Sequence, residues 1–287
     1  MLFSLGEKPE LRYESAKIGL AKLGYESMTH YLADMCALVL EETNLLPHVN
    51  AGTLSDDEID LLKPVSASMG MMLETVSRRL TRKGMPHHGC PDKTPLQRLR
   101  TLERSGAKNV PFTTGLLIGI GETWEERIDA LNAINASHRR HRHIQEVIIQ
   151  NFQRKPDIAM AAHPEPYLED MLRTIAVARI ILDPEISLQA PPNLHQRHIS
   201  YLKAGINDWG GISPVTIDFI NPQHEWPEIL KLYESCASVG FKLLERLTVY
   251  PRFISKRSEY LDPGLRKRIL SMAGDDGFAS EQILEAI

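Results

Sequence analysis

Polar side chains recur where apolar, β-prone runs of the sequence end. Most are uncharged amides, which suit hydrogen bonding to a heterocycle with alternating donors and acceptors better than general acid–base catalysis. If each run is a strand of a parallel sheet, these side chains gather at the edge where such folds bind ligands. The alternative is that each one caps a helix or closes a turn. The residues are Glu7, Asn50, Glu74, Glu122, Gln150, Asn151, Gln189, Asn193 and Asp208.

Lys155 offers a different chemistry. It follows the predicted strand 144–150, and a lysine near the mouth of a barrel can form a Schiff base with a carbonyl substrate. Its neighbour Arg154 favours the alternative that both side chains are exposed cations. A Schiff-base lyase or aldolase using Lys155 is therefore a second interpretation of the chain.

Two histidine-containing segments resemble metal sites in composition. His87, His88 and Cys90 lie within four residues, but no fourth ligand for zinc lies nearby in the sequence. The run 138–143 contains only histidine and arginine and could bind a metal or a phosphate. It lies at the end of a predicted helix, where positive charge is favourable, so we expect a solvated, structural role. We predict no metal site from these residues.

The stretch 110–123 is the element around which the other residues are organised. Its apolar first half is typical of a strand buried on both faces. Gly119 and Gly121 follow, and without a Cβ atom the backbone there can approach a ligand closely. Thr123, with Glu126 three residues later, predicts the capped start of a helix. Strand, glycine turn and helix form a βα unit with its loop at the ligand-binding edge.

Predicted strands alternate with helices of about 10–16 residues along the whole chain, which is the pattern of a parallel α/β sheet. Seven candidate strands fit this pattern: the first, within residues 1–6, is cut short, and the last lies in the glycine-rich segment 205–213. A helix over 195–204 and a packing strand at 246–251 are also predicted. We predict a (β/α) TIM-type barrel over residues 1–250 that lacks its first βα unit. A helical tail, residues 251–287, is predicted to pack on it. Unpaired strand edges in an incomplete barrel would expose apolar surface, so we also expect poor solubility.

The composition excludes several classes of protein. A net charge of −4 and a pI near 6.3 give no support for a nucleic-acid or membrane-surface partner. Cys36, Cys90 and Cys236 are too far apart for a disulfide framework or a C-x-x-C site. No apolar run approaches the ~20 residues of a membrane span, and no signal peptide is recognisable. We therefore expect a cytoplasmic protein with no membrane or nucleic-acid partner.

Taken together, several segments resemble the radical S-adenosylmethionine (SAM) superfamily, and more closely the deazaflavin (FO) synthase family. The likeness covers nearly the whole chain, and the combination is specific although no single motif is. The segments are 2–10, 45–50, 68–74, 91–93, 110–122, 145–152, 189–194 and 207–216.

The resemblance implies a set of SAM-binding residues. The turn at Gly6 and Glu7 matches the superfamily's glycine–glutamate turn, whose carboxylate holds the amino group of SAM in a charge-assisted hydrogen bond. The segment 115–122 matches G-x-I-x-G-x-x-E, with Leu117 at the isoleucine position, and in the superfamily this strand packs on the adenine. Glu122 would anchor the turn rather than react. The implied residues are Gly6, Glu7, Gly115, Leu117, Gly119 and Glu122.

The closest resemblance, to the ring-closing subunit of FO synthase (7,8-didemethyl-8-hydroxy-5-deazariboflavin synthase), implies a carbon–nitrogen lyase. A [4Fe–4S] cluster would reduce SAM, and the 5′-deoxyadenosyl radical would take hydrogen from 5-amino-5-(4-hydroxybenzyl)-6-(D-ribitylimino)-5,6-dihydrouracil. Ring closure with loss of ammonia gives the deazaflavin FO. The implied partners are this small molecule, the companion subunit that makes it, and an electron donor such as ferredoxin or flavodoxin.

The substrate-binding candidates are the polar residues at the strand ends, with no acid or base assigned among them. They are Asn50, Glu74, Gln150, Asn151, Gln189, Asn193 and Asp208.

The chain departs from the family in one respect. The family's cluster is held by C-x-x-x-C-x-x-C ahead of the glycine–glutamate turn, whereas the five residues before Gly6 include no cysteine. Cys36, Cys90 and Cys236 cannot replace this motif at their spacing. We therefore expect that the chain begins late and does not itself hold the cluster. A non-catalytic relative that binds substrate or a partner is a third interpretation.

Overall fold

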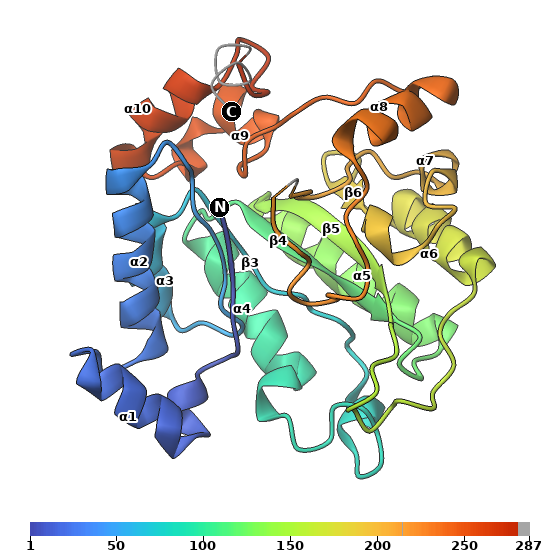
Figure 1. Cartoon of the computed structure of the whole chain (residues 1–287), viewed down its shortest axis with the longest axis horizontal. Coiled ribbons are helices and arrows are strands. Elements are labelled where there is room, and N and C mark those ends of the chain that lie inside the picture. The colour runs from blue at the N-terminus through green and yellow to red at the C-terminus, as the bar shows by residue number, and fades with distance from the viewer. Residues whose placement is uncertain (214, 281–287) are drawn as a thin grey trace.

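The computed structural model describes residues 1–213 and 215–280, which contain a six-stranded sheet (Figure 1). Each strand pairs in parallel with the next in chain order, so the carboxyl ends lie at one edge. This confirms the predicted parallel α/β fold, while closure into a barrel stays a prediction. The strands are β1 (Leu2–Ser4), β2 (His48–Asn50), β3 (Ser68–Gly70), β4 (Phe112–Ile118), β5 (Ile144–Asn151) and β6 (Ser187–Gln189).

Helices connect the strands and continue beyond the sheet. The α-helices are α1 (Glu14–Lys22), α2 (Met28–Glu42), α3 (Asp56–Leu62), α4 (Pro95–Ala107), α5 (Trp124–His141), α6 (Leu168–Ile181), α7 (Ser200–Ala204), α8 (Ile229–Ser238), α9 (Pro251–Ser255) and α10 (Pro263–Met272). Short 3₁₀ helices are Pro9–Leu11, Lys63–Val65, Arg78–Thr81, Pro91–Lys93, Pro192–Leu194 and Ser258–Tyr260. No described helix has the length and apolar character needed to cross a membrane.

Local sequence signals account for where two of these helices begin. The Thr123 side chain accepts a hydrogen bond from the Glu126 amide, and the Glu126 carboxylate accepts one from the Thr123 amide. Ser55 and Glu58 form the same reciprocal pair at the start of α3. Each capping box satisfies two amide groups that the first turn leaves unpaired. The predicted start of α5 is confirmed.

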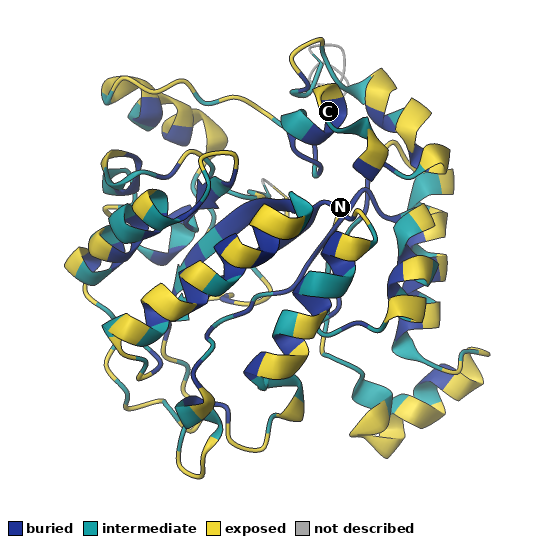
Figure 2. Ribbon diagram, turned by 180° about the vertical axis from the view of Figure 1, so that it is seen from behind, coloured by how far each residue is buried: buried dark blue, intermediate teal, exposed yellow. Residues whose placement is uncertain are grey.

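The helices cover one face of the sheet, as Figure 2 shows with α4 and α5 in front of the strands. Leu116 and Ile118 of β4 are buried in the core beneath the helices, whereas Leu117 between them is half-buried. Because successive strand residues point to opposite faces, Leu117 lies on the face away from the helices. Ile148 and Gln150 of β5 share that face, which we call the inner face.

The segment that follows α8 packs at the amino ends of the strands. A second hydrophobic cluster joins Leu46 and Ala67, which precede β2 and β3, to Val249, Phe253 and Ile269. Terminal helices are thus present as predicted. The division into a core of residues 1–250 and a tail of 251–287 stays a prediction, since residues 281–287 lie outside the described part.

Three predicted elements differ from the structure. The glycine-rich segment 205–213 is not a full strand but one bridge, between Gln189 and Asp208, and Pro214 beside it lies outside the described residues. The expected packing strand at 246–251 is irregular backbone. The helix predicted over 195–204 is confined to α7. In 205–213 the three glycines, Asn207 and Asp208 disfavour a regular strand.

Candidate functional site

Two of the candidate SAM residues, Glu7 and Gly119, lie at the same edge of the sheet. Glu7 follows β1 and Gly119 follows β4, with β2 and β3 between them. All four strands are parallel, so the two residues lie beyond the carboxyl ends of their strands. This arrangement is compatible with one ligand spanning the edge.

The turn after β4 depends on Glu122. Its carboxylate accepts hydrogen bonds from the amides of Gly119 (2.8 Å) and Ile120 (2.9 Å) and from Arg127 Nε (2.7 Å). The Glu122 side chain is only 2% exposed. Gly119 has φ +84°, and a Cβ there would lie 2.3 Å from Cγ of Pro166. Glu122 therefore anchors the turn, and only glycine fits its first position.

The Glu7 carboxylate is held against the loop that follows β2. The Thr53 hydroxyl donates to Glu7 Oε1. A Cβ on Gly52 would lie 2.4 Å from Glu7 Oε2, so the missing side chain leaves the space that the carboxylate occupies. Arg98 Nη2 lies 3.8 Å from Oε2, and the Glu7 side chain is 10% exposed. Glu7 is thus a largely buried acid in a fixed position.

Glu74 lies beyond β3 in a left-handed conformation (φ +63°) that non-glycine residues rarely adopt. Lys93 Nζ donates to both of its oxygens (2.8 and 3.1 Å), and His87 Nε2 lies 2.9 Å from Oε2. Arg98 Nη1 is 3.7 Å from Oε1. Burial acts to raise the pKa of Glu74, but the hydrogen bond from His87 and the charges of Lys93 and Arg98 outweigh it and lower the pKa to about 2.

Glu7, Glu74, His87, Lys93 and Arg98 therefore form one buried group, which we call the Glu7–Glu74 cluster. Sequence reasoning found the two acids but missed Arg98, which lies on α4. It considered His87 only as a possible zinc ligand, whereas the structure pairs this side chain with Glu74. The one group of His, Cys, Asp and Glu in the described residues that is close enough to hold a metal includes neither His87 nor Cys90.

The candidate amides do not all point the same way. Asn50 and Gln150 are half-buried on the inner face and make no side-chain hydrogen bond with the described residues. Asn151 is adjacent to Gln150 and therefore faces the opposite side of the sheet. Gln150 and Asn151 thus do not both reach a ligand on the inner face, although both lie at the expected edge.

Asn151 instead lines a cavity of about 470 Å³ at the carboxyl ends of β5 and β6. Its Oδ1 atom is buried without a hydrogen-bond partner among the described residues. Pro166, which packs on Gly119, also lines this cavity, as do His195 and Arg197. The volume is within the range of small-molecule sites. The cavity and the Gly119 turn are therefore neighbouring parts of one edge.

Gln189 and Asn193 are engaged by the chain itself. Gln189 Nε2 donates to the Trp209 carbonyl (3.2 Å), and Asn193 Nδ2 donates to Asp218 (2.9 Å). The carbonyl oxygen of each side chain is buried without a partner in the described part of the chain. Asn193 thus fastens the loop that carries Asp218.

Asp208 forms the most extensive ion pair on the inner face. Arg246 Nε and Nη2 donate to its two oxygens (2.6 and 2.7 Å), and Arg246 Nη2 lies 3.5 Å from Glu146 Oε1. The guanidinium stacks on the Tyr250 ring, with Cζ 3.9 Å from the centroid. Burial raises the pKa of Glu146, and nearby Asp208 adds to this. The sequence pattern pointed to Asp208 but not to Arg246 or Glu146.

Lys155 donates to the Ile220 carbonyl at the surface of the molecule. This contact gives no specific support for a Schiff-base role, which stays an untested alternative.

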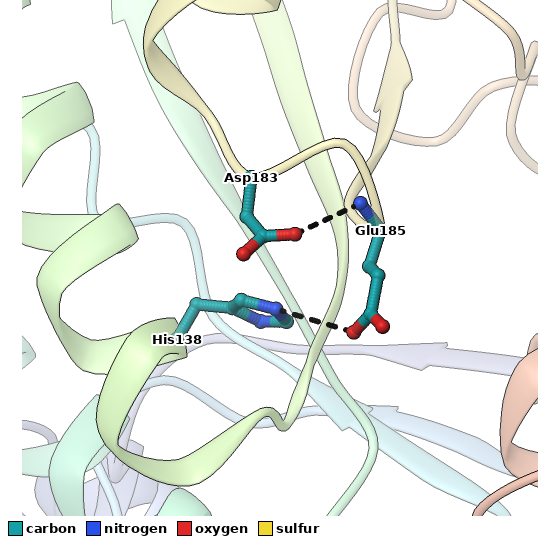
Figure 3. A group of neighbouring side chains, drawn as sticks. All are labelled: His138, Asp183 and Glu185. Atoms are coloured by element: carbon teal, nitrogen blue, oxygen red, sulfur yellow. Dashed lines mark hydrogen bonds and ion pairs between the residues drawn. The ribbon is translucent and has the colours of Figure 1, made fainter.

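His138, Asp183 and Glu185 form the group that could hold a metal, with one donor atom from each within 4.8 Å of the others (Figure 3). Arg142 Nη1 is 2.6 Å from Asp183, and Arg252 Nη1 is 3.6 Å from Glu185. Two guanidinium charges already balance the two carboxylates, and a divalent cation would leave an excess of buried positive charge. We interpret the group as an ion-pair network.

The run 138–143 is at the end of α5 as predicted, and Arg139 and Arg140 are exposed, but the expectation that the run is solvated is wrong for its two outer histidines. His138 and His143 are both 0% exposed. Burial lowers the pKa of each to about 3, assisted by Arg252 at His138 and by His141 at His143. Loss of hydration on burial disfavours the charged imidazolium, and the neighbouring positive charge adds to this effect.

These two histidines predict acid sensitivity. Between pH 6.5 and about 3 the unfolded chain binds protons at these positions and the folded chain does not, so stability should fall as the pH falls. Each histidine should contribute a slope of about 1.4 kcal/mol per pH unit. Urea titrations at several pH values would measure it. H143Q should reduce the slope, whereas substitution of the exposed His88 should not; an unchanged slope in H143Q would contradict the assignment.

The cysteines of this chain do not fit an iron–sulfur cluster. Cys36 on α2 and Cys236 on α8 are 0% and 1% exposed and belong to the hydrophobic core. Cluster iron needs thiolates that converge on one site. The residues present are compatible with SAM, because Glu7 offers a carboxylate for an ammonium group and the half-buried Leu117 offers an aliphatic surface for a flat base.

The amino-acid sequence of this chain is similar to those of known proteins. It is 48% identical over 275 residues to FO synthase of Mycobacterium tuberculosis, covering 95% of this chain and 32% of that protein. The chain thus spans about a third of the length of such relatives. It is 46% identical over 280 residues to 7,8-didemethyl-8-hydroxy-5-deazariboflavin synthase of Methanopyrus kandleri, covering 97% of this chain and 83% of that protein.

Solved structures support the fold. Methylornithine synthase (PylB) aligns with a TM-score of 0.57 at 16% identity, over 74% of this chain and 63% of its own. The FeFe-hydrogenase maturase HydG of Carboxydothermus hydrogenoformans aligns with a TM-score of 0.58 at 16% identity, over 84% of this chain and 60% of its own. A search of protein-family models found no match. The level of identity and the coverage of the Methanopyrus protein show that the chain belongs to the FO synthase (7,8-didemethyl-8-hydroxy-5-deazariboflavin synthase) family.

Proposed function

We propose that this chain supplies the SAM-binding and substrate-binding surface of a radical SAM lyase. The lyase would close the deazaflavin ring of FO from the hydroxybenzyl–ribityliminouracil adduct, with loss of ammonia. The observation that carries the proposal is that Glu7 and the Gly119 turn, in a member of the FO synthase family, share one edge of a parallel sheet.

In this proposal the Glu7 carboxylate receives the ammonium group of SAM. A carboxylate that is 10% exposed strengthens such a bond, because little water competes for it. The adenine would lie against Leu117 and the glycine backbone at Gly115 and Gly119. Glu122 would act only through the turn that it anchors.

The adduct would be gripped from the inner face. The Asn50 and Gln150 amides there make no side-chain hydrogen bond within the described part of the chain, and Gln189 and Asp208 lie at the end of β6 and at the bridge beside it. Amides offer a donor and an acceptor in one plane, which matches a uracil ring. Asn151 faces the opposite side of the sheet, and Asn193 is hydrogen-bonded to the loop that carries Asp218. These two residues would contact at most a ligand in the adjoining cavity. Glu74 would act through its contacts in the Glu7–Glu74 cluster.

The reaction also needs a [4Fe–4S] cluster, which would supply an electron to SAM. Since the cysteines of this chain do not fit it, we assign the chain only binding, orientation and exclusion of water. The companion subunit and a ferredoxin or flavodoxin are the partners that belong to this proposal.

The proposal is tested with the E7Q variant. Loss of the charged acceptor should weaken SAM binding, measured by isothermal titration calorimetry, by about 10- to 100-fold. The exposed Glu26 offers a matched control, and E26Q should bind SAM like the wild type. FO formation, followed by chromatography, should fall with SAM affinity. Unchanged SAM affinity in E7Q would contradict the proposal.

A further inference from the structure

Arg98 lies between the two acids of the Glu7–Glu74 cluster. Its Nη2 atom is 3.8 Å from Glu7 Oε2 and its Nη1 atom is 3.7 Å from Glu74 Oε1. The two acids come from the ends of β1 and β3, whereas Arg98 comes from α4. Its side chain is 7% exposed. One buried guanidinium thus faces carboxylates from two separate strand ends.

The guanidinium is itself held in place by backbone. Arg98 Nε donates to the Asp92 carbonyl (3.2 Å), and Nη1 donates to the Met72 carbonyl. These carbonyls belong to the segment before α4 and to the segment after β3. The planar, fixed fork of arginine holds two partners at a defined separation, which the flexible ammonium of lysine does not.

Glu7 is supported from its other side as well. Thr53 donates to Oε1, and Gly52 leaves room for Oε2. Neither residue lies in the Gly6–Glu7 turn. Arg98 and the 52–53 loop therefore both contact the Glu7 carboxylate, from segments distant in sequence.

We propose that Arg98 is a positioning residue: by bridging Glu7 and Glu74 it fixes the Glu7 carboxylate in the orientation that receives the SAM ammonium group. This inference rests on the proposed function, because it assumes that Glu7 binds SAM. Arg98 does not touch the reacting atoms; it acts through Glu7.

Positioning and simple electrostatics predict opposite effects for removal of Arg98. If only charge mattered, loss of a cation beside Glu7 would strengthen its attraction for an ammonium group. If Arg98 positions Glu7, loss of Arg98 leaves the Glu7 carboxylate free to rotate. Ordering this carboxylate then reduces the free energy of SAM binding. The sign of the change in affinity therefore separates the two roles.

In the experiment, SAM is titrated calorimetrically into the protein. R98M is expected to weaken SAM binding by about 10-fold or more, and R98K to recover only part of the loss. R100M is the matched control, because Arg100 is exposed on the same helix. It should leave SAM affinity unchanged. Tighter or unchanged SAM binding by R98M would overturn the inference.

A double-mutant cycle with E7Q identifies the route of action. If Arg98 acts through Glu7, R98M should change SAM affinity by less than about 3-fold in the E7Q background, whereas independent effects would multiply. Multiplying effects would overturn the inference while leaving Glu7 as a SAM ligand. Should R98M fail to fold, R98K carries the same test. If E7Q binds SAM like the wild type, the proposed function itself fails.

Discussion

Replacing Arg246 with methionine is expected to lower the free energy of unfolding by about 3 to 5 kcal/mol. Arg246 makes two hydrogen bonds to Asp208 and lies 3.5 Å from Glu146. The side chains of the two acids are 12% and 7% exposed, so neither can regain full hydration when the guanidinium is lost. The methionine fills much of the same volume, so the loss measures chiefly the uncompensated charge.

Urea unfolding monitored by circular dichroism would measure this loss. R139M removes an exposed arginine from α5 and should change the free energy of unfolding by less than about 0.5 kcal/mol. The double variant D208N/R246M should be more stable than the sum of its single variants predicts, because the second change removes the unpaired charge left by the first. A loss below about 1 kcal/mol in R246M would show that the pair contributes little.

Replacing Gly115 with alanine should destabilise the sheet by about 3 kcal/mol. A Cβ at this position would lie 2.3 Å from the Ile148 carbonyl oxygen and 2.8 Å from Sδ and Cε of Met72. Met72 can change its rotamer, but the carbonyl belongs to the backbone of β5. β4 and β5 must therefore separate, and their pairing is the longest in the sheet.

Thermal and urea unfolding of G115A would test this prediction, and SAM titration would show whether the strand still presents Leu117. Gly211 supplies the control: nothing lies within 4 Å of a Cβ built there, and its φ is not left-handed. G211A should leave stability within about 0.5 kcal/mol of the wild type. If G115A matches G211A, β4 and β5 have more freedom than the structure shows.

Much of the fold follows from local patterns. The apolar run before Gly119 predicted β4, and Thr123 with Glu126 predicted the start of α5, because a capping box and a buried strand are decided by residues within a few positions. Segment 205–213 is an element that local patterns did not predict correctly. Its place after α7 in the alternating pattern predicted a strand, but it pairs only through Asp208, because its glycines, Asn207 and Asp208 are residue types that disfavour regular strands.

Some features of the site also follow from the sequence, and others do not. The sequence by itself determined the parallel α/β fold, the glycine turn with its Glu122 anchor, and membership of the FO synthase family, since these depend on short-range spacing or on overall likeness. Only the tertiary structure decided the partners of the buried acids: Arg98 for Glu7 and Glu74, and Arg246 for Asp208. The physical reason is that an ion pair depends on distance in space, and these partners lie 24 to 91 residues apart on elements whose approach is fixed by packing of the whole sheet.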